Sequence, residues 1–210
     1  MRNIFIPSQP EIEGVDNPKN DKSQRLKIDF TYYDLNEKAW TAPAGTLTDG
    51  ASIPSILWSI IGHPFDSAYF NAAIIHDHFC EKADESKTKE ERDKYRMQID
   101  VMFFYACLCC GSTPSKAQEL LVGVRIGAIF YPWSPRKSRT QVLESFSQSE
   151  NDTKIIKVFQ ELGAPQNYPE SDNDRKYAIS GIPGVDGILN PDINSIDEKI
   201  IKSLQKEGLL

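Results

Sequence analysis

The sequence predicts an α+β fold, in which a small N-terminal antiparallel sheet packs against a mainly helical core of about four helices. Residues 26–33 alternate between apolar and polar side chains, which is typical of a half-buried strand. From residue 52 onward, helix start signals recur together with apolar residues at helical spacing. After residue 138, Ser, Asn, Asp, Gln and Pro dominate. We therefore expect one domain over residues 1–137 and a polar C-terminal extension over residues 138–210.

The predicted sheet is built around a hairpin. Turn residues at 34–38 follow the strand over 26–33, and residues 39–42 can return as its antiparallel partner. A short third strand is expected at 46–48, and an edge strand within residues 1–25.

The helices are predicted from their start and stop signals. Ser52 precedes Ile53-Pro54, and a serine followed by an early proline is a typical helix start. Gly111 should end a helix that carries apolar residues from Tyr95 to Ala106, and Thr113-Pro114 starts the next. The core helices are thus expected over about 52–60, 66–81, 95–110 and 114–130. In the extension, residues 153–162 and 194–209 have amphipathic spacing, so we expect one or two further helices there.

The bulk composition limits the classes of function. The chain has 210 residues, of which 40% are hydrophobic and 26% charged, and its formal net charge is −6. An acidic chain lacks the basic surface that phosphate binding needs, so no nucleic-acid partner is expected. The sequence contains no apolar run of the roughly 18 residues that a membrane span requires. No signal peptide is recognisable either, so we expect synthesis in the cytoplasm and export only by another route.

A polar pair inside an apolar run marks the candidate site. His76 and Asp77 lie within the run 72–79, where an unpaired buried polar group would cost roughly 1–3 kcal/mol. Imidazole and carboxylate groups are ligands of catalytic divalent metals, and an open position holds a water whose pKa falls towards ~7. We therefore expect a divalent metal, zinc being favoured, with His76, Asp77 and Asp100 as ligands. Asp49, just after a strand, is a further candidate for this site.

Each candidate also has a structural interpretation. His76 can hydrogen-bond a carbonyl group in the core, and Asp49 can be a turn residue. Ser52 can serve only as a helix N-cap, while Arg96 and Asp100, four residues apart, can form a helix-surface pair.

Cys80 has two interpretations as well. It follows His76 by four residues, so a helix would place both on one face, where Cys80 can be a metal ligand or a packed thiol.

Three motifs resemble a known family when taken together: Thr48-Asp49-Gly50-Ala51-Ser52-Ile53-Pro54, His76-Asp77 and Arg96-x-x-x-Asp100. They are similar to the domain of unknown function 1353 family, which occurs in bacteriophages, prophages and bacterial genomes. The resemblance covers about residues 1–132. The chain departs from the family pattern at Ile99, where alanine is frequent, and at His78, where an aromatic residue is frequent. The resemblance implies a site made of Asp49, Ser52, His76, Asp77, Arg96 and Asp100. Within this site we expect catalytic roles for Asp49, Ser52, Asp77 and Arg96.

Two functions of different classes remain open. The first is a metal-dependent hydrolase that acts on peptide or amide bonds of the cell wall, in a phage or secreted-effector setting. The second is a non-enzymatic structural or interaction protein, in which the motif residues form a buried polar network. In the second case, the C-terminal extension would bind a protein partner.

Overall fold

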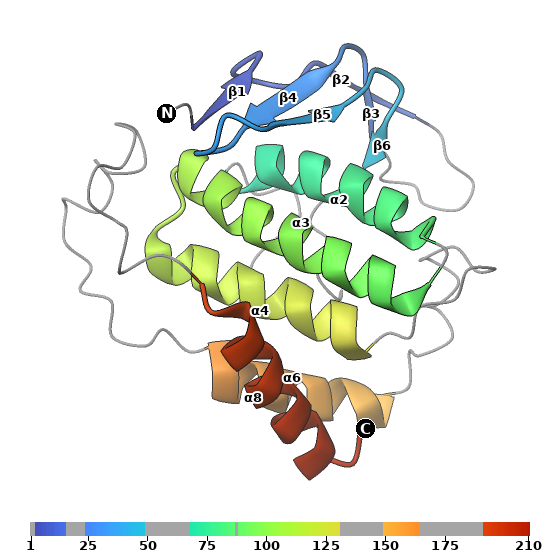
Figure 1. Cartoon of the computed structure of the whole chain (residues 1–210), viewed down its shortest axis with the longest axis vertical. Helices are drawn as coiled ribbons and strands as arrows, with labels where there is room; N and C mark the ends of the chain where they lie inside the picture. The colour runs from blue at the N-terminus through green and yellow to red at the C-terminus, as the bar shows by residue number, and fades with distance from the viewer. Residues whose placement is uncertain (1–2, 16–23, 49–67, 87, 131–148, 164–190) are drawn as a thin grey trace.

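The computed structural model describes residues 3–15, 24–48, 68–86, 88–130, 149–163 and 191–210 (Figure 1). The expected α+β class is confirmed, because these residues contain two small antiparallel sheets and five helices. The helix predicted over residues 52–60 lies outside the described residues.

The strands form two sheets rather than one. In spatial order, the first sheet contains β1 (Ile4–Ile6), β4 (Phe30–Tyr33) and β5 (Ala39–Ala42). The second sheet contains β2 (Ile12–Gly14), β3 (Gln24–Leu26) and β6 (Leu47–Thr48).

The single strand predicted over residues 26–33 is divided between these sheets. Leu26 ends β3 and Phe30 begins β4, and both are buried. Ile28 lies between them in phase with the buried residues, yet it is exposed. The chain bends at residues 27–28, and Asp29 beside this bend accepts a 2.8 Å hydrogen bond from the backbone N–H of Ala44.

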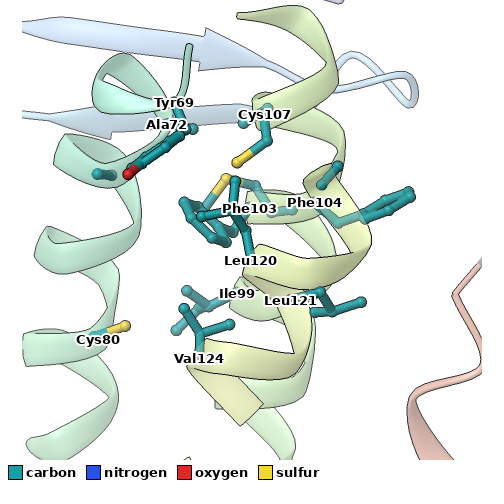
Figure 2. Packing of buried hydrophobic residues seen from close by; sticks show 14 of the residues in the cluster. Tyr69, Ala72, Cys80, Ile99, Phe103, Phe104, Cys107, Leu120, Leu121 and Val124 are labelled. Carbon is teal, nitrogen blue, oxygen red and sulfur yellow. The ribbon is translucent and has the colours of Figure 1, made fainter. Parts of the chain in front are cut away.

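Three helices form successive layers beneath the sheets, as Figure 1 shows: α2 (Phe70–Asp84), α3 (Lys89–Cys109) and α4 (Pro114–Phe130). Helix α2 contacts β4, β5 and β6 on one side and α3 on the other, and α3 in turn packs on α4. The layers are joined by buried apolar side chains, with Phe103 and Ile99 of α3 facing the space between the helices (Figure 2).

The helix ends follow their local sequence signals. Thr88 caps α3 by accepting a 3.1 Å hydrogen bond from the backbone N–H of Glu91. Gly111 ends the helix at a φ of 95°, and the next residue, Ser112, returns a 3.0 Å hydrogen bond to the carbonyl of Cys107. Thr113 then accepts a bond from the N–H of Lys116 at the start of α4.

The C-terminal extension contributes α6 (Ser149–Gly163) and α8 (Ile193–Lys206), which pack on α4 and on each other. Both bury one apolar face, as their amphipathic spacing predicts. Ile200 and Leu204 are buried on α8, while Ile201 is exposed. Among all the described helices, none has the length and apolar character needed to cross a membrane.

Candidate functional site

The centre of the site is a hydrogen bond between two neighbouring helix layers. His76 of α2 and Asp100 of α3 approach to 2.7 Å between Nε2 and Oδ1, and neither side chain is exposed. Both residues lie on the inner faces of their helices, among the apolar side chains that hold α2 against α3. An ionised Asp100 accepts only, so it selects the imidazole form that carries a proton on Nε2.

Two arginines keep Asp100 ionised. Arg125 of α4 donates a 2.8 Å hydrogen bond from Nη1 to Asp100 Oδ2, and Arg96 Nη2 lies 3.7 Å from Oδ1. Burial by itself would raise the pKa of Asp100, but Arg96, His76 and Arg125 together hold that pKa well below its ordinary value. The carboxylate therefore carries its charge in the interior because three neighbours stabilise it.

Arg96 is an incompletely paired group in this interior. It is 3% exposed, and its Nε makes no hydrogen bond within the part of the chain that the structure describes. The 3.7 Å separation from Asp100 is beyond hydrogen-bond range. Burial lowers the pKa of Arg96, but Cys80 and Asp100 outweigh burial and raise it above its ordinary value, so the guanidinium stays charged.

The ionic network continues into the C-terminal extension. Asp197 of α8 accepts two hydrogen bonds from Arg125, 2.7 Å from Nε and 2.5 Å from Nη2. This is the bidentate arrangement that matches a guanidinium fork to a carboxylate. Burial opposes the charge on Arg125, yet Asp100 and Asp197 raise its pKa above the ordinary value. Four helices, α2, α3, α4 and α8, thus contribute His76, Asp100, Arg125 and Asp197 to one connected series of hydrogen bonds.

A thiol completes a potential metal-binding cluster. Cys80 Sγ lies 3.5 Å from Nδ1 and 3.6 Å from Nε2 of His76, and the side chains of both residues are fully buried. Potential ligand atoms of His76, Cys80 and Asp100 all lie within 4.8 Å of one another. These three groups could hold an ion, and the donor types suit zinc.

A hydrogen bond between Thr48 and Asp77 connects two of the sequence motifs. Thr48 at the end of β6 donates a 3.0 Å hydrogen bond from Oγ1 to Asp77 Oδ2 on α2. Both side chains are buried, at 3% and 6% exposure. The start of the Thr48–Pro54 motif therefore lies against the His76-Asp77 motif, although 29 positions separate the two bonded residues.

The structure places four of the six predicted site residues in the interior. His76 and Asp100 are bonded, Arg96 lies beside Asp100, and Asp77 is held by Thr48. The roles assigned to them remain predictions. The other two predicted residues, Asp49 and Ser52, lie outside the described residues.

Two members of the network were not predicted. Arg125 interrupts the apolar run 120–126, and a lone charge in such a run is a signal that could have identified it. Asp197 gives no such signal, because an acidic residue on an amphipathic helix normally faces water.

Comparison with known proteins finds a family that part of this chain resembles. The model of the family described as "Protein of unknown function (DUF1353)" matches residues 24–124, a little under half of the chain. The resemblance inferred from the motifs is thereby confirmed over these residues, which include His76, Asp77, Arg96 and Asp100. Arg125 and Asp197 lie beyond the matched range.

Two curated relatives come from Sinorhizobium fredii (strain NBRC 101917 / NGR234). "Uncharacterized protein y4jT" is 41% identical over 95 residues, which is 45% of this chain and 26% of the relative. "Uncharacterized protein y4iH" is 34% identical over 122 residues, which is 58% of this chain and 45% of the relative. The matched region thus spans less than half the length of each relative. No solved structure matches the chain significantly.

Proposed function

We propose that the protein is a metal-dependent hydrolase whose zinc ion is bound by His76 and Cys80 and whose His76 is oriented by Asp100. The observation that carries this proposal is the 2.7 Å bond from His76 Nε2 to a buried carboxylate. Metal-binding histidines commonly use one ring nitrogen for the metal and donate the other N–H to such a carboxylate. In this arrangement Nδ1 is the ligand atom and Asp100 is a supporting residue.

Two distances within the cluster bear on this division of roles. Two ligands of a tetrahedral zinc, one sulfur and one nitrogen, are separated by about 3.6 Å given ordinary bond lengths. Cys80 Sγ lies 3.5 Å from His76 Nδ1 but also 3.6 Å from Nε2, so the thiol or the ring must rotate before one zinc can bind both Sγ and Nδ1. The 2.7 Å between His76 Nε2 and Asp100 Oδ1 is a hydrogen-bond distance, shorter than the separation of two ligands on one ion. Asp77, beside His76 and bonded to Thr48, and Asp49 remain candidates for further ligands or for the general base.

The proposed reaction is attack by water on a carbonyl carbon. Zinc would supply a water of lowered pKa, and a carboxylate would accept its proton. Peptide or amide bonds of the cell wall are the substrates we propose, in a phage or secreted-effector setting. The C-terminal extension is proposed to contact a protein partner.

Metal analysis and two matched pairs of variants test the proposal. The purified full chain should contain about one zinc per molecule. His76→Gln and Cys80→Ser should each lose it, while His78→Gln on the same helix and Cys107→Ser in the same core should retain it. Release of soluble fragments from purified peptidoglycan should follow the metal content. A protein without stoichiometric metal, or a His76→Gln variant that keeps both metal and activity, would exclude this function.

A second candidate function is supported by the charges around Asp100. Both carboxylate oxygens are already bonded, to His76 and to Arg125, and two guanidinium groups beside them oppose a further cation. In this alternative the protein is non-enzymatic, and the network specifies how the helices pack. It predicts that His76→Gln lowers stability in the metal-free protein, whereas the hydrolase proposal predicts its main effect on metal content and on peptidoglycan cleavage.

A further inference from the structure

We infer that Asp197, in the C-terminal extension, is a positioning residue for His76 and acts through Arg125 and Asp100. The inference rests on the proposed function in that it assigns His76 the central role in the site. It adds that the site is completed by a residue outside the region that matches the family model. The extension would thus take part in the site itself, in addition to any contact with a partner.

The connection is continuous and short. Arg125 donates hydrogen bonds of 2.7 and 2.5 Å to Asp197 and one of 2.8 Å to Asp100. Asp100 in turn forms a 2.7 Å hydrogen bond with His76. Arg125 uses one edge of its guanidinium, Nε and Nη2, for Asp197 and uses Nη1 for Asp100. Because the guanidinium is planar and rigid, fixing one edge fixes the direction of the remaining donor.

Burial makes this coupling effective. The Arg125 side chain is 6% exposed, so water cannot readily replace Asp197 as the partner of Nε and Nη2. The Asp197 side chain is 19% exposed and is the only member of the series Asp197–Arg125–Asp100–His76 that reaches solvent to that degree. Without the Asp197 carboxylate, Arg125 would turn further toward Asp100 and alter the bond to His76.

Helix α8 has other attachments that do not involve Arg125. Ser203 donates a 2.9 Å hydrogen bond to Glu161 of α6, and Lys206 lies 3.2 Å from the same carboxylate group. Ile200 and Leu204 are buried against the neighbouring helices. Asp197 is therefore not required merely to hold α8 in place, and its loss can be separated from loss of docking.

The test observes His76 directly in the metal-free full chain by NMR of its imidazole ring. The Nε2–H proton of a fully buried, hydrogen-bonded ring should exchange slowly and give a resolved downfield resonance. Asp197→Asn should shift or broaden this resonance, and Asp197→Glu should restore it in part. Two controls on α8, Asp192→Ala at its N-cap and Ser203→Ala at the contact with α6, should leave it unchanged.

The NMR spectra of the variants support or refute the role of Asp197. If the His76 resonances of Asp197→Asn coincide with those of wild type, the inference is wrong. If all α8 variants shift them equally, Asp197 acts only through docking, and the inference is again wrong. Should Asp197→Asn fail to fold by circular dichroism, the comparison of Asp197→Glu with the two controls decides in the same way. Failure of the wild type to bind zinc would refute the hydrolase proposal alone, because this measurement needs no metal.

Discussion

His76 and Asp100 are joined by a 2.7 Å hydrogen bond in the interior between α2 and α3, and neither side chain reaches solvent. In an interior of low polarity, such a bond stabilises the fold when both partners are paired, and losing one partner lowers the free energy of unfolding. Asp100 also pairs with Arg125, so a single carboxylate stabilises groups from two neighbouring helices. This shared role makes Asp100 the residue whose substitution should have the largest effect.

Asp100→Asn should lower the free energy of unfolding by about 3–5 kcal/mol, because Arg125 and Arg96 would lose the charge that compensates them. Asp93→Asn is the matched control on the same helix. The Asp93 side chain is 40% exposed and pairs with Lys89 and with Arg92, and Arg92 keeps Asp84 as its other partner, so the loss of the Asp93 charge should cost about 1 kcal/mol or less. Urea unfolding of the metal-free proteins measures both. An equal loss of unfolding free energy in Asp100→Asn and Asp93→Asn would contradict the central role of Asp100.

Acid should destabilise the protein through the same carboxylate. Burial opposes ionisation, but Arg96, His76 and Arg125 leave the pKa of Asp100 below its ordinary value in the folded protein. The unfolded chain therefore takes up the proton first, near pH 4. The stabilisation by Asp100 is fully present above about pH 5 and is lost as the pH falls from the unfolded pKa toward the folded pKa.

In that interval a single carboxylate contributes a slope of at most about 1.4 kcal/mol per pH unit. Urea unfolding between pH 6 and pH 3 should show this slope for the wild type, in addition to the slope that Asp100→Asn retains. Parallel pH profiles for the two proteins would show that Asp100 is not the group responsible.

Thr48→Val should weaken the contact between β6 and α2. The substitution removes the 3.0 Å hydrogen bond to the buried Asp77 carboxylate, and bonds to charged groups contribute about 1.5–3 kcal/mol. Thr31→Val is the control, since the Thr31 side chain bonds an uncharged group, the hydroxyl of Thr41, at 2.8 Å, and the loss of this bond should cost about 1 kcal/mol. Thermal unfolding of both variants checks the order. A larger loss for Thr31→Val would mean that Asp77 does not depend on Thr48.

Gly111→Ala should destabilise the protein by about 1–2 kcal/mol, because the residue after α3 has a φ of 95° that a side chain disfavours. Space is not the cause, since among the described residues no atom beyond the two chain neighbours lies within 4 Å of an added Cβ. Gly14→Ala has equally open space without a positive φ, so it should be neutral or stabilising by up to about 1 kcal/mol. Urea unfolding should show that the free energy of unfolding falls in Gly111→Ala and stays the same or rises in Gly14→Ala.

The end of α3 and the start of α4 could be predicted from the chain alone, since those signals are local, whereas α2 and α3 begin at Phe70 and Lys89 rather than at the expected residues 66 and 95. Gly111 and Thr113-Pro114 mark backbone conformations that depend on a few neighbouring residues. The polar pair His76-Asp77 stood out because its apolar neighbours imply burial, and both residues are buried. Periodicity was less reliable for residues 26–33, where the outward turn at Ile28 divides one expected strand between two sheets.

The partners of Asp100 required the tertiary structure. Arg125 lies 25 positions from Asp100, and Asp197 lies 72 positions from Arg125, so neither pairing leaves a local pattern. Layer packing of α3, α4 and α8 brings these charges together, and burial then makes their pairing necessary, because an unpaired interior charge is too costly. The sequence thus located His76, Asp77, Arg96 and Asp100, whereas packing determined which charges surround them.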